Sequence, residues 1–86
     1  MKLLVVEDEA LLRHHLQTRL TDSGHVVESV PNAEEALYQT EQFNHDLAVI
    51  DLGLPGMGGL DLIRQLRSRG KTFPILILTA RGNWQD

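Results

Sequence analysis

Three carboxylates and one hydroxyl directly follow short apolar runs of the sequence. Glu7 and Asp8 follow the first of these runs. Asp51 and Thr79 each follow a later one. Such runs are typical of strands buried on both faces of a parallel sheet, and parallel sheets bind ligands at the carboxyl ends of their strands. We therefore expect the four side chains to meet at one edge of a sheet. The apolar runs are residues 3–6, 47–50 and 75–78.

This set of side chains predicts a metal-assisted phosphoryl transfer. Carboxylates packed together repel and raise one another's pKa, and a hard divalent cation such as Mg²⁺, which prefers oxygen ligands, relieves this repulsion. A carboxylate can also attack phosphorus to give an aspartyl-phosphate, while the metal neutralises charge on the transferring group. The Thr79 hydroxyl could then hydrogen-bond the phosphoryl oxygens.

The segments between the apolar runs have the pattern of helices. Leucine recurs every four residues at Leu12, Leu16 and Leu20, which predicts a helix from residue 9 to about residue 22, with Leu11 beside the stripe. Gly24 is expected to end this helix, because glycine readily takes the positive φ of that position. A second strand is expected over residues 25–30.

Two further helices are expected. Asn32 is a suitable N-cap for the second, with Glu35 at the capping-box spacing. Residues 52–59 contain Pro55 and four glycines, and we interpret them as a flexible loop. The third helix then runs over about residues 60–68 and ends at Gly70. Its expected buried stripe is Leu62, Ile63 and Leu66.

Composition narrows the class of protein. Four expected strands alternating with three helices in 86 residues predict a single α/β domain with a parallel sheet and helices on both faces. A net charge of −4 argues against a nucleic-acid binder, and the absence of cysteine excludes disulfides and thiolate sites. The apolar run at the N-terminus is too short for a signal peptide or membrane span, so we expect a cytoplasmic protein that contacts no membrane.

Three segments together resemble the signatures of two-component response-regulator receiver domains of the OmpR subfamily. The resemblance covers the whole chain. It implies a doubly wound, flavodoxin-like receiver fold with strand order 2-1-3-4. It also implies that residues 1–86 form a partial receiver domain, without the fifth strand and fifth helix, with the fourth helix barely begun, and without a DNA-binding domain. The segments are residues 5–9, 51–59 and 78–81.

The resemblance also implies roles for individual residues in a phosphoacceptor module of a transcriptional regulator, rather than in an enzyme. Asp51 would accept the phosphoryl group from a phosphohistidine on a sensor histidine kinase. The side chains of Asp8 and Asp51 and the backbone carbonyl of Gly53 would hold Mg²⁺. Glu7 would act through a metal-bound water or from just outside the ligand set, and Thr79 would be the switch hydroxyl.

The sequence departs from the family pattern in one respect that bears on partners. The lysine that pairs with the phosphoryl group in the family lies on the fifth strand, and Lys71 is expected at the opposite end of the sheet. The fourth strand becomes an exposed edge, so a homodimer through this edge or the adjacent face is expected. Full-length members bind DNA through a separate domain, and this segment itself is expected to contact no nucleic acid.

Other functions stay open at this point. A Mg²⁺-dependent phosphatase of the haloacid-dehalogenase type would have an aspartate two residues after the nucleophile, where this chain has Gly53. An interaction fragment that is never phosphorylated is a second alternative, and a flavodoxin-like cofactor carrier is a third. The adjacent His14 and His15 do not share a helix face and so make no metal pair. His25 and His45 flank strand starts, and we assign them no role.

Overall fold

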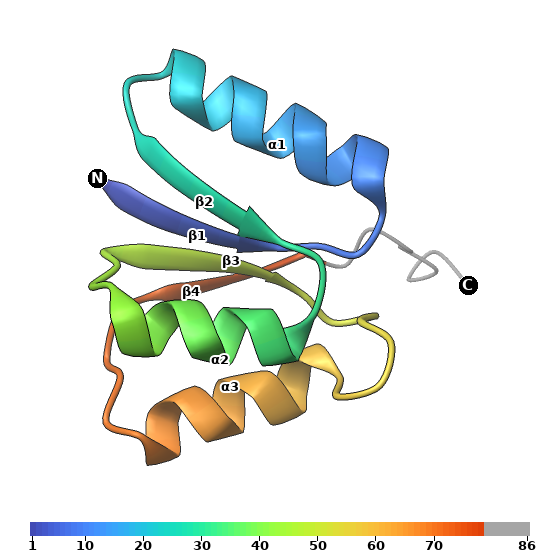
Figure 1. The fold of residues 1–86 in the computed structure, drawn as a ribbon, viewed down its shortest axis with the longest axis vertical. Helices are drawn as coiled ribbons and strands as arrows, with labels where there is room; N and C mark the ends of the chain where they lie inside the picture. Colours follow the sequence, from blue (N-terminus) through green and yellow to red (C-terminus); the bar gives the residue numbers. More distant parts are fainter. Residues whose placement is uncertain (79–86) are drawn as a thin grey trace.

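Four parallel strands form one sheet in the order β2-β1-β3-β4, as the resemblance implied (Figure 1). The computed structural model describes residues 1–78. The first strand is central and pairs with both the second and the third, while the fourth pairs with the third. The carboxyl ends of all four strands therefore lie along the same edge of the sheet. The strands are β1 (Lys2–Val6), β2 (Val26–Val30), β3 (Leu47–Asp51) and β4 (Ile75–Leu78).

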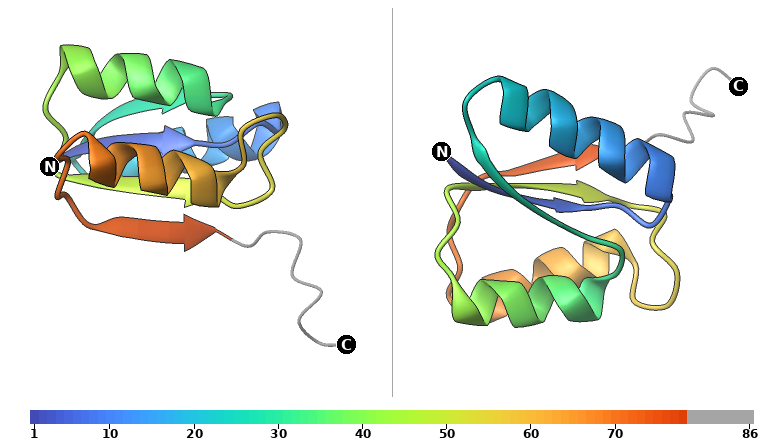
Figure 2. Two further views of the ribbon diagram at one scale, coloured as in Figure 1. Left: turned by 90° about the horizontal axis from the view of Figure 1, so that it is seen from below. Right: turned by 45° about the horizontal axis from the view of Figure 1, so that its top comes forward.

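Helices cover both faces of the sheet. One helix lies on one face and two lie on the other (Figure 2). The helix ends follow the local signals of the sequence: Asn32 Oδ1 accepts a hydrogen bond of 2.8 Å from the Glu35 N–H, and Gly24 and Gly70 take positive φ just after their helices. These three predictions are confirmed. The helices are α1 (Ala10–Asp22), α2 (Ala33–Gln42) and α3 (Gly59–Ser68).

The main core lies between the sheet and the helices α2 and α3. Side chains of β1 and β3 form its sheet side. Small and branched apolar residues of the two helices pack against them. The predicted stripe of α3 is confirmed, because Leu62 and Leu66 are fully buried and Ile63 packs against the core. The fully buried members are Leu4, Val6, Ala33, Ala36, Ala48, Ile50, Leu62 and Leu66.

The opposite face is much less enclosed. Within the part of the chain that the structure describes, α1 has no buried residue. Leu12, Leu16 and Leu20 are only half-buried, and Leu11 is 62% exposed. Within residues 1–78 the helix packs mainly against β1 and β2, on one side of the sheet. The helical period of the leucines was predicted well, but the depth to which they are buried depends on what else covers this face.

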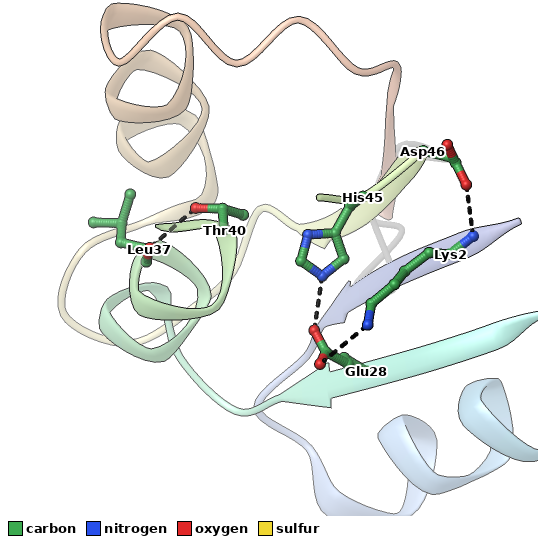
Figure 3. A network of polar contacts seen from close by, with 6 residues as sticks. All are labelled: Lys2, Glu28, Leu37, Thr40, His45 and Asp46. Carbon is green, nitrogen blue, oxygen red and sulfur yellow. Dashed lines mark hydrogen bonds and ion pairs between the residues drawn. The ribbon is translucent and has the colours of Figure 1, made fainter. Parts of the chain in front are cut away.

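The amino end of the sheet carries a polar network (Figure 3). The buried imidazole of His45 donates its Nε2–H to Glu28 Oε1 at 2.7 Å, and Lys2 Nζ lies 3.6 Å from Glu28 Oε2. The Lys2 backbone N–H donates to Asp46 Oδ2 at 2.7 Å. These contacts join β1, β2 and the residues just before β3. No role was expected for His45 from the sequence, whereas the structure shows it in a contact between distant segments.

Candidate functional site

Three acidic residues meet at the carboxyl edge of the two central strands, as their positions in the sequence predicted. Glu7 and Asp8 directly follow β1, and Asp51 is the last residue of the neighbouring β3. One carboxylate oxygen from each residue lies within 4.8 Å of the other two. Glu7 and Asp51 are each only 1% exposed, whereas Asp8 is partly open to solvent. A cluster of like charges at this depth requires a compensating partner.

The backbone holds one oxygen of each of the two buried carboxylates. The Glu9 N–H donates to Glu7 Oε2 at 3.0 Å, and the Gly53 N–H donates to Asp51 Oδ1 at 3.2 Å. The Glu9 side chain in turn caps α1 by accepting from the Leu12 N–H at 2.8 Å. Each carboxylate is therefore oriented by a bond to one oxygen, which leaves its second oxygen available.

The remaining oxygens have no hydrogen-bond donor among residues 1–78. They are Glu7 Oε1, Asp8 Oδ1 and Asp51 Oδ2, all of them buried. A buried charged oxygen without a partner is costly, and native structures rarely leave one unless a ligand or ion meets it. Three such oxygens from carboxylates, close to one another, are the donor set that a hard divalent cation prefers. The residues present thus fit a magnesium site.

The pKa of Glu7 is raised above its ordinary value. Burial is the main cause, and the nearby charges of Asp51 and Asp8 add to it, while the hydrogen bond from the Glu9 N–H acts in the opposite direction. This is the pattern expected of a carboxylate in a site built for a cation.

Other predicted site residues are placed as follows. Gly53 follows Asp51 by two residues, and its N–H is held by the Asp51 carboxylate. Lys71 precedes β4 and so lies at the amino end of the sheet, as expected. Thr79 lies outside the residues that the structure describes.

The loop interpretation of residues 52–59 was wrong at its last residue. Gly59 is the first residue of α3, not part of a flexible turn. A Cβ on Gly59 would overlap the Asp51 backbone carbonyl oxygen and lie 2.8 Å from Leu52 Cα. The helix therefore begins directly against the end of β3, and only glycine permits this approach.

Sequence reasoning missed one residue beside the acids. Arg13, in the second turn of α1, donates from Nη1 to the Glu7 carbonyl oxygen at 2.8 Å and to the Asp8 carbonyl oxygen at 3.3 Å. The spacing along the sequence gave only a weak signal, since an arginine on an exposed helix usually faces solvent. The contact depends on the turn between β1 and α1, which brings the helix back over the acidic pair.

Fold and site together define the class of protein. The model of the response regulator receiver domain matches residues 3–86, and the chain belongs to this family. The family match sets aside the phosphatase and the flavodoxin-like carrier that the sequence left open. None of the helices within residues 1–78 is long and apolar enough to cross a membrane.

Curated relatives narrow the class to the PhoP type of two-component response regulator. The chain is 80% identical over all 86 residues to the two-component response regulator PhoP of Pseudomonas aeruginosa, and it spans 38% of that protein. It is 52% identical to the transcriptional regulatory protein PhoP of Escherichia coli, again over its whole length, and spans 39% of it. The chain thus covers well under half of these relatives.

Solved receivers share the fold. The response regulator TrrA of Thermotoga maritima, solved in complex with Mg²⁺-BeF, is 33% identical with a TM-score of 0.88 over 98% of this chain and 73% of TrrA. The same regulator in complex with the histidine kinase ThkA gives a TM-score of 0.86 over 99% of this chain and 73% of TrrA.

Proposed function

We propose that this chain is the phosphoacceptor module of a two-component response regulator and that Asp51 accepts the phosphoryl group beside Mg²⁺. Asp8, Asp51 and the Gly53 carbonyl would hold the metal, and Glu7 would act through a bound water. The observation that carries the proposal is the set of three buried carboxylate oxygens without donors. The complex of TrrA with Mg²⁺-BeF supports the choice of metal.

The chemistry follows from the two oxygens of Asp51. The Gly53 N–H orients the Asp51 carboxylate through Oδ1, so that one of its oxygens would attack phosphorus while the carboxylate still faces the metal. A P–O bond forms to Asp51 as the P–N bond of a phosphohistidine breaks, and the imidazole nitrogen keeps the electron pair of that bond. When bound, Mg²⁺ supplies neutralisation of the charge on the transferring group. The Thr79 hydroxyl would contact the phosphoryl oxygens afterwards.

A sensor histidine kinase is the proposed donor, and the complex of TrrA with the kinase ThkA supports this. Residues 1–86 would act as one partial receiver domain in the cytoplasm, with transcription regulated through a separate DNA-binding domain of the longer protein. Self-association through β4 stays a prediction. Its support is the exposure of Leu76 and Ile77, at 59% and 48%, on the outer strand of the described sheet (Figure 2).

The test is the intact mass of the chain after incubation with Mg²⁺ and acetyl phosphate. We expect a phosphoryl adduct on the parent chain, none on Asp51→Asn, and none when the metal is removed with a chelator. Asp61→Asn is the matched control, because Asp61 is an exposed aspartate of α3 that pairs only with Arg64 among residues 1–78.

Two outcomes would contradict the proposal. An adduct that persists on Asp51→Asn would place the chemistry on another residue. An adduct on no variant would favour the interaction fragment that the sequence analysis left open.

A further inference from the structure

Arg13 stands in an unusual relation to the three acids. It is a cation on the helix that directly follows Glu7 and Asp8, and yet it forms no ion pair with a carboxylate within the part of the chain that the structure describes. Its guanidinium binds the backbone carbonyls of Glu7 and Asp8 instead. The positive charge of Arg13 therefore lies beside the acidic pair and contacts its backbone rather than its carboxylates.

We propose that Arg13 is a positioning residue that prepares the acidic pair to bind Mg²⁺; the inference rests on the function proposed above. Two carbonyls held by one guanidinium fix the peptide planes on either side of Asp8. These planes set the direction in which the Glu7 and Asp8 side chains leave the backbone. Hydrogen bonds from a charged donor are about twice as strong as neutral ones, so the constraint is a firm one.

The mode of contact also matters for electrostatics. A guanidinium bonded to the carboxylates would offset their repulsion, but it would occupy the oxygens that a metal needs. Bonded to the carbonyls, Arg13 leaves Glu7 Oε1 and Asp8 Oδ1 without a donor. Arg13 thus orients the acidic pair without competing for the oxygens that would bind the metal.

The Glu9 contacts complete this arrangement. The Glu9 N–H holds the Glu7 carboxylate, and the Glu9 side chain caps the helix that carries Arg13. The turn between β1 and α1 is therefore fixed at both of its ends. Partners of metal ligands that act in this way typically contribute about 10- to 100-fold to metal affinity.

The experiment measures Mg²⁺ affinity by isothermal titration calorimetry on the parent chain, Arg13→Met, Arg13→Lys and Arg19→Met. Arg19→Met is the matched control: it removes the same charge from an exposed position of the same helix. We expect Arg13→Met to weaken Mg²⁺ binding about tenfold. Arg13→Lys should recover part of the loss, because it keeps the charge without the planar fork of donors. Arg19→Met should bind as the parent does.

A kinetic readout separates positioning from general damage. The rate of adduct formation from acetyl phosphate should fall for Arg13→Met at low Mg²⁺ and return to the parent value at saturating Mg²⁺. Circular dichroism in chelator verifies the fold of each variant, and Arg13→Gln replaces Arg13→Met if the latter fails to fold.

The outcomes separate this inference from the proposed function. Parent-like Mg²⁺ affinity in Arg13→Met, or an equal loss in Arg13→Met and Arg19→Met, overturns the role of Arg13 alone. An adduct on Asp51→Asn overturns the assignment of the phosphoacceptor and leaves the comparison of Mg²⁺ affinities intact. A parent chain that binds no Mg²⁺ overturns both.

Discussion

The two ends of the sheet treat their acidic residues in opposite ways. At the amino end, each Glu28 oxygen has a cationic or imidazole partner, and Asp46 accepts from the Lys2 backbone N–H (Figure 3). At the carboxyl end, three carboxylates share a small volume, and each keeps a buried oxygen without a donor within residues 1–78. Acidic residues stabilise the amino end, whereas at the carboxyl end their burial without donors costs folding free energy.

This difference teaches where to look for function. Paired acids report on stability, since their contacts are already complete. Unpaired buried acids carry a free-energy cost that folding alone does not explain, and such costs are commonly retained where a ligand relieves them. The contrast between the ends can be tested by disturbing each in turn.

The largest effect is expected for Gly59→Ala at the carboxyl end. The new methyl group would overlap the Asp51 carbonyl and press on Leu52, so α3 must move away from the end of β3. We expect a loss of about 3 kcal/mol in the free energy of unfolding, measured by urea denaturation. Gly58→Ala is the control, because the nearest atom to its Cβ is 3.8 Å away. Equal losses in the two variants would mean that this end is not tightly packed.

An intermediate effect is expected for Glu28→Ala at the amino end. The substitution leaves the buried His45 Nε2 and the Lys2 ammonium without their shared partner. We expect a loss of about 2 kcal/mol in urea denaturation. Glu41→Ala, which removes a surface contact of 3.5 Å to Arg69, should change stability by less than about 0.5 kcal/mol. If Glu28→Ala and Glu41→Ala lose the same free energy of unfolding, the network at the amino end does not stabilise the fold.

The smallest effect is expected for Glu7→Gln, and its sign is opposite. The folded-state pKa of Glu7 is raised, so its contribution to stability is fully present below the unfolded pKa and is lost as the pH rises through the folded pKa. Without divalent cations, Glu7→Gln should therefore become more stable relative to the parent as the pH rises from about 4 to 7. Thermal unfolding across this range measures the trend. A relative stability that falls with pH would contradict it.

Sequence reasoning succeeded wherever the signal was local or followed from strand direction. The cap at Asn32 and the helix stops at Gly24 and Gly70 depend on a few adjacent residues. The meeting of the acids after β1 and β3 required only that the two strands be parallel neighbours. Helix caps and the direction of parallel strands follow the same rules in every α/β chain, so both could be predicted without the structure.

The remaining features depend on contacts between distant segments. His45 finds Glu28 across 17 residues, and nothing in the residues around either one indicates this. Arg13 reaches the acidic pair only because of the path of one turn. The exposure of Leu11 depends on what covers a whole face of the sheet. Periodicity gives the direction of a side chain but not its surroundings.

The weak burial of α1 has a consequence for local opening. Beside its half-buried leucines, this helix is joined to the rest of the domain by polar contacts, including the Arg13 bonds and a 2.7 Å bond from Ser29 Oγ to Gln17 Oε1. Water competes for such bonds better than it competes for apolar packing, so we expect α1 to open more readily than the helices that close the main core. Its amide protons should therefore exchange with solvent deuterium sooner than those of α2 and α3. A cation at the acidic pair would slow that exchange along the helix, which makes α1 a reporter of the site at its first turn.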